Sequence, residues 1–358
     1  MNANLPGTAF CLLVGVHQVP APVNPKTGNS FTGEFGAVVD GTGATFPTRE
    51  PLLQGLFAAH NQDIDNVTIR NLIIRDSTKA GIAAFYNLSD GWAIENNEIA
   101  NNKHGVQLPN STVVAHNFIH HNVGDPSNPV PSERGGAYGS FRAHDVLFLD
   151  NEIAFNGPEQ KVMGTQDVTF RDNFVHHNMR DGIWYDTDNT GAVIEGNLVT
   201  DNGREGIFYE VSAEAVIRNN TVLRNGVSGI FISTSRNVEI YGNVLESNYK
   251  GIQYYLSCDR IGGGSVGSDL ANNSSYGNTI QVSTQSYSAA SALVFNPHTC
   301  TSAQVTPYLD GSKNLTFKSN RYLGPSLTTR YWGWGNIWKS WAEWQALGQD
   351  ITGTLSAY

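Results

Sequence analysis

The fold is decided by a stretch in the middle of the chain where one short pattern returns three times. It reads Ala192-Val-Ile-Glu-Gly-Asn197, then Glu214-Ala-Val-Ile-Arg-Asn-Asn220, then Asn237-Val-Glu-Ile-Tyr-Gly-Asn243. Each copy alternates apolar and polar residues and ends in Asn, as expected of a short strand with one buried face. Related segments end at Asn71, Asn117, Asn151 and Asn173, and from Asn151 onward this Asn recurs every 22 to 24 residues.

Two further signals recur within each repeat. A second Asn follows five positions after the first, as at Asn202 and Asn225, and a Gly-Ile or Gly-Val pair then opens another strand. Three short strands in 22 to 24 residues match one coil of a solenoid. The sequence therefore predicts an all-β fold, a single-stranded right-handed parallel β-helix. A leucine-rich solenoid is disfavoured because its regular Leu spacing is absent.

The repeated Asn has a physical reason in such a fold. Asn tolerates the left-handed bend between two strands, and its amide can bond to the Asn of the next coil. We therefore expect ladders of stacked Asn side chains along the coils.

The steps between repeats outline one predicted domain over residues 1–358. Residues 1–60 are expected to form an N-terminal cap and the first coils, residues 61–325 the repeat coils, and residues 326–358 a C-terminal cap. In the last segment Trp338, Trp341, Trp344 and Leu347 are spaced three residues apart. That spacing predicts a short amphipathic helix within residues 336–348 that covers the open end of the solenoid.

Composition excludes several classes of protein. Only 15% of the residues are charged, against about 25% in ordinary globular proteins. With 40% hydrophobic and 10% aromatic residues, the chain is not disordered. The net charge of -10 argues against a nucleic-acid partner, because no basic patch is present to displace counterions. It also makes a polyanionic substrate harder to hold without a cation.

Compartment and partners follow from weaker signals. The sequence contains no run of 18 apolar residues, so we expect no membrane span. Residues 9–16 fit a first strand better than a signal peptide. Cys258 and Cys300 lie in the same long excursion and can form a disulfide, which suits a secreted or periplasmic protein. We expect a monomer without a cofactor.

The strands that begin with Gly-Ile show where chemistry can occur. Aligned on their glycines, they read Gly182-Ile-Trp-Tyr-Asp-Thr-Asp188, Gly206-Ile-Phe-Tyr-Glu-Val-Ser212, Gly229-Ile-Phe-Ile-Ser-Thr-Ser235 and Gly251-Ile-Gln-Tyr-Tyr-Leu-Ser257. Alternation points the Ile and the following Tyr or Ile inward. One outward row is then Trp184, Phe208 and Phe231, which we expect to face solvent, and the next contains Asp186 and Glu210.

Two carboxylates in neighbouring coils are easier to explain by function than by folding. Like charges directly opposite each other destabilise a sheet. A pair about 5 Å apart is what a retaining glycosidase needs, and proximity favours one protonated member. Flat aromatic rings beside Asp186 and Glu210 suit the apolar faces of sugars. The structural alternative is an exposed acidic pair, with the aromatics covered by a loop.

Other residues are candidates for supporting roles. Asp181 and Glu205 form a second acidic pair, but Arg180 and Arg204 beside them favour salt-bridged turn residues. Asp188 is placed to orient the site or bind a cation. Lys161 is expected to border the cleft or to be a solvated turn lysine.

The inserted segment 123–140, including Tyr138, is predicted to form a wall of the cleft. The histidines call for a different interpretation. His120, His121, His176 and His177 occupy equal positions two coils apart. That spacing favours ladder or turn residues over a metal site, with His121 and His177 as possible substrate contacts. We expect no metal site.

The strand Gly182-Ile-Trp-Tyr-Asp-Thr-Asp-Asn, followed after one coil by Gly206-Ile-Phe-Tyr-Glu-Val-Ser, resembles the site strands of pectin-lyase-like β-helix glycosidases. It is most similar to the β-xylosidases of glycoside hydrolase family 120. In that family the Asp of the first strand is the nucleophile and the Glu one coil on is the acid/base. The resemblance thus implies Asp186 as nucleophile and Glu210 as acid/base. It covers residues 182–212 closely and the repeats loosely.

Three functions from different classes remain. The leading hypothesis is a retaining glycoside hydrolase acting on a neutral or weakly charged poly- or oligosaccharide. The second is a polysaccharide lyase or uronate epimerase, in which Asp186, Asp188 and Glu210 hold Ca²⁺ and Lys161 or an Arg abstracts a proton. The scarcity of basic residues on the site strands counts against it. The third is a glycan-binding β-helix without catalysis.

Overall fold

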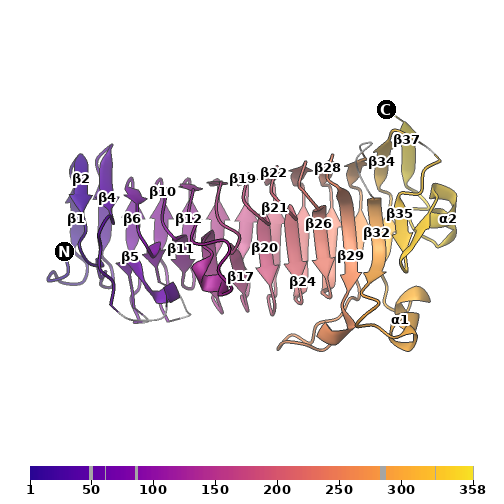
Figure 1. Ribbon diagram of the computed structural model, residues 1–358, viewed down its shortest axis with the longest axis horizontal. Helices are drawn as coiled ribbons and strands as arrows, with labels where there is room; N and C mark the ends of the chain where they lie inside the picture. The colour runs from indigo at the N-terminus through magenta and orange to yellow at the C-terminus, as the bar shows by residue number, and fades with distance from the viewer. Residues whose placement is uncertain (48–50, 61, 85–87, 283–287, 327, 358) are drawn as a thin grey trace. The chain divides into compact units, whose positions relative to one another are not determined.

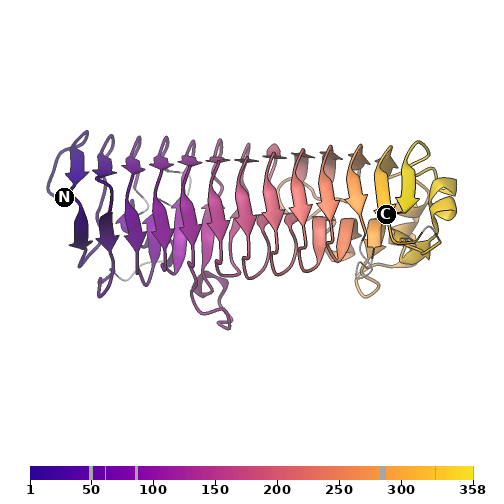
Figure 2. The ribbon, with the colours of Figure 1, turned by 90° about the horizontal axis from the view of Figure 1, so that it is seen from above.

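The computed structural model describes residues 1–47, 51–60, 62–84, 88–282, 288–326 and 328–357. The chain divides into two compact units, Met1–Arg180 and Asp181–Tyr358. Both units have the predicted right-handed parallel β-helix fold: three sheets of short parallel strands, with successive coils stacked side by side (Figures 1 and 2). The single-domain organisation expected from the sequence remains a prediction.

Unit 1 has three sheets, and each complete coil after the first supplies one strand to each sheet. Its first sheet contains β1 (Ala9–Leu12), β3 (Ser30–Gly33), β6 (Thr68–Arg70), β9 (Ala93–Glu95), β12 (Val113–Ala115), β15 (Leu147–Leu149) and β18 (Thr169–Arg171). Its second contains β2 (Gly15–Gln18), β4 (Ala37–Asp40), β7 (Ile73–Arg75), β10 (Glu98–Ala100), β13 (Phe118–His120), β16 (Glu152–Ala154) and β19 (Phe174–His176). Its third contains β5 (Gly55–Ala58), β8 (Ala80–Ala83), β11 (His104–Leu108), β14 (Gly136–Phe141) and β17 (Lys161–Met163), with the 3-10 turns η1 (Pro51–Leu53) and η2 (Pro131–Glu133).

Unit 2 repeats the arrangement, except that the last strand of its third sheet pairs antiparallel with its neighbour. Its first sheet contains β21 (Ala192–Glu195), β24 (Ala213–Arg218), β27 (Arg236–Tyr241), β30 (Ser274–Tyr276) and β33 (Thr316–Lys318). Its second contains β22 (Leu198–Thr200), β25 (Thr221–Leu223), β28 (Val244–Glu246), β31 (Thr279–Gln281), β34 (Arg321–Gly324) and β37 (Thr354–Ala357). Its third contains β20 (Ile183–Asp186), β23 (Ile207–Glu210), β26 (Ser228–Ser233), β29 (Lys250–Leu256), β32 (Ser288–Phe295), β35 (Trp332–Trp334) and β36 (Ile337–Lys339).

The predicted Asn ladders are confirmed, but the left-handed bend and the ladder hydrogen bonds belong to two neighbouring residues rather than to one Asn. The ladder Asn is buried, and the residue before it takes the left-handed bend, as Asn219 (φ 55°) does before Asn220. Asn197 donates through its backbone N–H and its side-chain amide to Asn220 Oδ1. Asn220 donates through the same two groups to Asn243 Oδ1. Each amide thus satisfies buried groups in neighbouring coils, where an unpaired polar group is costly.

The C-terminal end of unit 2 is closed by aromatic packing, as predicted. A short helix, α2 (Trp341–Ala346), begins at a capping box formed by Ser340 and Glu343. Its Trp344 is fully buried, contacts Phe317 and donates to the buried carboxylate of Asp350. Asp350 also accepts from the backbone and amide of Asn320, so it occupies the last position of the Asn ladder. The other helix, α1 (Ser302–Leu309), follows the second cysteine of the disulfide.

Candidate functional site

The register predicted for the Gly-Ile strands is confirmed in unit 2. Strand β20 pairs with β23 so that Trp184 lies beside Phe208 and Asp186 beside Glu210. Strand β23 pairs with β26 in the same register, which extends the two rows to Phe231 and Ser233. The inward positions are fully buried, as expected of alternating strands. The two carboxylates therefore lie on the same face of neighbouring strands, at the ends where both strands finish.

Each carboxylate of this pair has defined contacts. Asp186 is 8% exposed, and Thr187 Oγ1 donates a hydrogen bond of 2.8 Å to its Oδ1. Glu210 accepts a charge-assisted hydrogen bond of 2.9 Å from Arg260 Nη1. Arg260 comes from η3 (Cys258–Arg260) in the long excursion after β29, which carries no repeat register. The sequence reading missed it, although Cys258 two residues earlier marked the segment.

The aromatic row is less exposed than predicted. Trp184 and Phe208 are each only 6% exposed and stack on each other, with ring centroids 5.6 Å apart. Phe231 is half-buried, and its ring lies 5.0 Å from Phe208 and 5.7 Å from Tyr255. The expectation of a solvent-facing row is therefore wrong for Trp184 and Phe208, because large rings on neighbouring strands cover one another. Phe231 remains the accessible member.

Asp188 has a structural task. Its Oδ1 accepts backbone hydrogen bonds of 2.6 Å from Ser265 and 3.1 Å from Val266. It thereby anchors the excursion that carries Arg260. Across the described residues, no three acidic, histidine or cysteine side chains converge as a metal site requires. The alternative of a cation bound at Asp188 remains a prediction.

The second acidic pair, Asp181 and Glu205, lies in the connections just before β20 and β23 and is buried. The backbone N–H of Glu205 donates to Asp181 Oδ1, and the backbone N–H of Ser228 donates to Glu205 Oε2. Arg204 lies 3.5 Å from Glu205 Oε1, which confirms the predicted ion pair. Burial raises the pKa of Glu205, and the nearby charge of Asp181 adds to this. The two carboxylates connect successive coils in the manner of the Asn ladder.

Unit 1 contains a separate pocket of about 240 Å³ on its third sheet. Lys161 lies at the start of β17 and forms part of the lining, close to the buried carboxylate of Glu159 (Nζ–Oε2 3.7 Å). Arg134, from the inserted segment, donates to Glu159 Oε1 at 2.9 Å, and Arg180 lies 3.9 Å from the same oxygen. Phe141 adds an apolar surface. The sequence reading missed Glu159 because its carboxylate finds Arg134 only through an insertion without repeat register.

His104 lines the same pocket and was also missed. It is buried in β11, and its Nε2 lies 2.8 Å from the carbonyl oxygen of Ser132 in η2. Its Nδ1 has no hydrogen-bond partner among the described residues. Burial lowers the pKa of His104 to about 4, so the ring is neutral and donates from Nε2. No sequence signal distinguishes it from the other histidines.

The prediction that Tyr138 lines a cleft is wrong. Tyr138 is in strand β14, in register with Val106 of β11, and is fully buried. Its ring packs against Phe148 and Phe170 in the core of unit 1. The insertion ends at Gly135, before β14 begins, and Tyr138 takes the inward place that Val106 has one coil earlier.

The histidines are ladder and turn residues, as favoured from the sequence. The rings of His121, Phe155 and His177 stack in one column, with centroids 5.1 and 5.2 Å apart. His177 follows β19 of the second sheet, whereas Lys161 lies in the third sheet of the same unit. The structure therefore gives His177 a stacking role and does not bring it beside Lys161.

Comparison with known proteins agrees with this architecture. A family model described as a right-handed β-helix region matches residues 132–280. The A-module of the mannuronan C-5 epimerase AlgE6 from Azotobacter vinelandii superposes with a TM-score of 0.66 at 14% identity, over 98% of this chain and 91% of that one. The Dettilon tailspike protein gives a TM-score of 0.52 at 13% identity, over 98% and 62% of the two chains.

A third solved structure has the same fold. The GH87 α-1,3-glucanase of Streptomyces thermodiastaticus gives a TM-score of 0.50 at 12% identity, over 88% of this chain and 58% of that one. At these identities the likeness establishes the fold. The comparison with curated proteins finds no significant match. The specific resemblance to family 120 β-xylosidases remains a prediction.

Proposed function

We propose that this chain is a carbohydrate-active enzyme that hydrolyses a glycosidic bond with retention of configuration, using Asp186 and Glu210. The supporting observation is the in-register pairing of these two residues on neighbouring parallel strands. Such strands lie about 4.8 Å apart. Retaining glycosidases hold their carboxyl groups about 5 Å apart, and inverting ones about 6.5 to 9.5 Å.

The energetics of the sheet support a functional reason for the pair. Two like charges directly opposite each other on neighbouring strands destabilise a sheet by a few tenths of a kcal/mol or more. The next residue of the row, Ser233, carries no charge, and neither does Tyr255 after it. Beyond Glu210 the row thus carries no further acidic residue at these two positions.

The reaction follows from the positions of the two groups. The Asp186 carboxylate attacks the anomeric carbon while Glu210 gives its proton to the leaving oxygen, so the glycosidic bond breaks and an ester to Asp186 forms. Glu210, now a carboxylate, takes a proton from water, and that water attacks the anomeric carbon and releases Asp186. Thr187 orients the nucleophile. Arg260 fits the second step, in which Glu210 is charged.

The substrate that we propose is a poly- or oligosaccharide. Phe231 supplies an accessible ring beside the carboxylates, suited to the apolar face of a sugar. The similar structures include an epimerase of mannuronan and a glucanase, which agrees with a glycan substrate.

We also propose a secreted or periplasmic location and a monomeric state. The predicted bond between Cys258 and Cys300 is present, and disulfides persist in oxidising compartments. No helix among the described residues has the length and apolar character needed to cross a bilayer.

The test uses wild type, Asp186→Asn and Glu210→Gln on a panel of plant and bacterial glycans. New reducing ends and the ultraviolet absorbance of unsaturated ends are followed together, with and without EDTA. Reducing ends without absorbance, abolished by both substitutions and indifferent to EDTA, are expected. Unsaturated ends, or cleavage that survives both substitutions, would overturn the proposal.

A second candidate function rests on the pocket of unit 1. Lys161 lines this pocket, and Lys161, Arg134 and Arg180 together exceed the single negative charge of the buried Glu159. This excess of positive charge suits the carboxylate of a uronate. A lyase or epimerase would use Lys161 as the base that removes the proton next to that carboxylate. In the same panel this function predicts unsaturated ends, or exchange of a ring proton with solvent, that Lys161→Met abolishes and Asp186→Asn leaves intact.

A further inference from the structure

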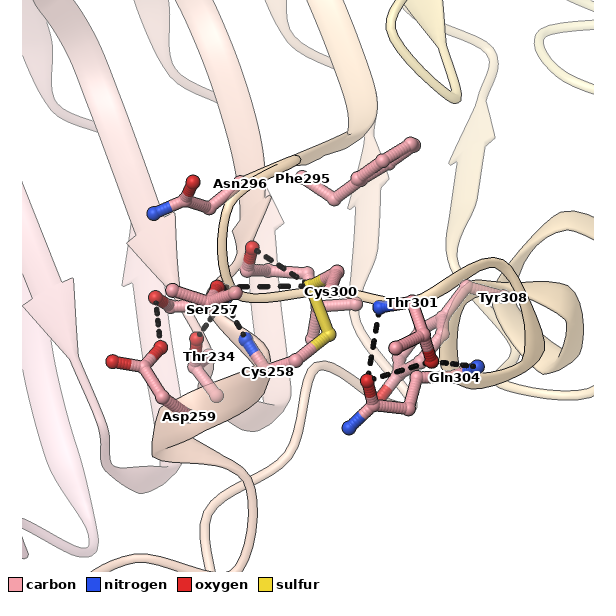
Figure 3. Close-up of a disulfide and its surroundings, with 12 residues drawn as sticks. Thr234, Ser257, Cys258, Asp259, Phe295, Asn296, Cys300, Thr301, Gln304 and Tyr308 are labelled. Atoms are coloured by element: carbon pink, nitrogen blue, oxygen red, sulfur yellow. Dashed lines mark hydrogen bonds between the residues drawn. A yellow bond between two sulfur atoms is a disulfide. The ribbon is translucent and has the colours of Figure 1, made fainter.

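The loop of residues 257–268 is the segment of unit 2 that brings Arg260 to the carboxylate pair. Figure 3 shows the disulfide between Cys258 and Cys300 that joins the start of this loop to the segment leading into α1. The backbone N–H of Ser257 donates to Thr234 Oγ1 at 2.9 Å. Inside the loop, Ser268 Oγ donates to the carbonyl oxygen of Arg260 at 2.7 Å. The loop is therefore fastened at its start and closed on itself at its end.

A second set of contacts fastens the middle of the loop. Asp188 Oδ1 accepts from the backbone N–H groups of Ser265 and Val266. Arg236 donates to the carbonyl oxygens of Val266 and Gly267. Gly264 has φ +68°, and a Cβ there would come within 2.0 Å of Asp188 Oδ1. Only glycine fits this approach, because any side chain would push the loop off its anchor.

A surface pocket of about 420 Å³ lies between this loop and the strand ends. Thr187 and Val211, which line one side, directly follow Asp186 and Glu210 in the chain. The other side consists of loop residues: Asp259, Arg260, Gly263 and Gly264. Because Arg260 lines the pocket and also donates a hydrogen bond to Glu210, the pocket lies next to the carboxylate pair.

The lining indicates the chemistry of the ligand. Asp259 offers a carboxylate acceptor, and the hydroxyl of Ser257 that donates to it lowers its pKa. The Arg260 guanidinium has several N–H donors, and across the described residues Glu210 is its one hydrogen-bonding partner. Gly263 and Gly264 line the pocket with backbone rather than side chains. Donors and acceptors flanking such a wall suit sugar hydroxyls.

Charge decides between a neutral and an acidic sugar. The pocket and the adjoining pair contain the carboxylates of Asp186, Glu210 and Asp259, against the single guanidinium of Arg260. Arg260 already pairs with Glu210. A uronate carboxylate placed here would meet more negative than positive charge, so the pocket favours a neutral residue.

We propose that residues 257–268 form one wall of a subsite that binds a neutral sugar residue of the substrate beside Asp186 and Glu210. Asp259 and Arg260 make its polar contacts, and the bond between Cys258 and Cys300 holds the wall in place. The identity of the ligand as a sugar rests on the function proposed above.

The test measures binding by calorimetry in an Asp186→Asn background, so that no probe is consumed. The neutral probes are xylotetraose, cellotetraose, mannotetraose and maltotetraose, and the charged probe is tetragalacturonic acid. At least one neutral probe is expected to bind. Asp259→Ala and Arg260→Gln should each weaken it about tenfold, as expected for loss of a hydrogen bond to a charged group. Gly264→Ala should weaken it to a similar extent, because the added methyl group displaces the loop from Asp188.

Matched controls separate the subsite from general damage to the loop. Gly262→Ala introduces the same methyl group at φ +71° but meets no atom within 4 Å, so binding should stay within about twofold. Cys258→Ser with Cys300→Ser should weaken binding, whereas Cys11→Ser, at the exposed free cysteine, should not. Circular dichroism confirms that each variant is folded.

Several outcomes overturn the subsite. They are binding of no neutral probe, tighter binding of tetragalacturonic acid that depends on Arg260, or neutral binding that Gly264→Ala and Arg260→Gln leave unchanged. Failure of the hydrolase proposal gives a different result. A neutral probe then binds with the expected loop dependence, yet the enzyme with Asp186 restored cleaves no glycan.

Discussion

The Asn column of unit 2 and the outward row of its third sheet run through the same coils but follow different rules. Along the column, Asn197, Asn220 and Asn243 repeat the same side chain and the same hydrogen bonds. Along the row, Asp186 is followed by Glu210, Ser233 and Tyr255. A position that folding requires stays constant from coil to coil, because every coil meets the same neighbours. A position that changes is one that folding leaves open.

The largest expected effect is the loss of hydrolysis when either carboxylate of the row is replaced, with the fold left intact. Asp186→Asn or Glu210→Gln should lower hydrolysis on the order of a thousandfold. Either should change the free energy of unfolding by less than about 1 kcal/mol, because relief of the like-charge repulsion offsets the weaker hydrogen bond from Thr187 or Arg260. Rates on the responsive glycan and urea unfolding measure both effects. Ser233→Ala, the next residue of the row, is the control and should retain activity.

The next largest effect is a loss of stability when an Asn of the column is replaced. Asn220 accepts from the backbone and amide of Asn197 and donates to Asn243 and to the carbonyl oxygen of Ile194. Asn220→Ala leaves these buried partners unsatisfied and should cost about 3 kcal/mol of unfolding free energy or more. Asn219→Gly changes the exposed Asn next to it and keeps the left-handed bend, so its cost should stay below about 1 kcal/mol. Equal losses would show that the column does not carry the fold.

A pH effect of similar size is expected in unit 1. Burial lowers the pKa of His104 from 6.5 to about 4, so between these values the unfolded chain binds the extra proton. Stability from this group is therefore complete above pH 6.5 and is lost as the pH falls toward 4, by at most about 3 kcal/mol. Urea unfolding across this range measures it. His104→Gln should flatten the profile, and the exposed His298→Gln should not; a profile unchanged by His104→Gln would refute a buried neutral ring.

The smallest effect has the opposite sign. Burial raises the pKa of Glu205, so the folded state binds the proton more tightly than the unfolded chain. Its contribution to stability is then present at low pH and is lost as the pH rises through the raised pKa. Thermal unfolding of Glu205→Gln should show a variant that gains on wild type as the pH increases. Glu214→Gln, at an exposed position, should show no such trend.

The same contrast explains what the sequence could predict. Repetition made the coils, the Asn ladders and the register of Asp186 with Glu210 readable, because equal spacing places equal residues side by side. The burial of Trp184 and Phe208 could not be predicted, because the stacking of two rings depends on neighbours outside the local sequence pattern.

Insertions limited the prediction of the site. Arg260 and Glu159 gain their partners through segments without repeat register, so no spacing argument reaches them. Tyr138 was misplaced because the strand after the insertion begins at Gly136 without the Gly-Ile signal of its neighbours. A disulfide at Cys258 was the one local sign that the excursion is fixed to the fold.

The central claim is that Asp186 and Glu210 act as a closely spaced catalytic pair, and the stereochemistry of the first product tests it most directly. Proton NMR of wild-type enzyme with the responsive glycan, recorded before the product mutarotates, shows the anomer that is released. Adjacent, in-register strands predict the anomeric configuration of the substrate, by a double displacement. Release of the opposite anomer would require a wider pair with water between its members and would contradict the account.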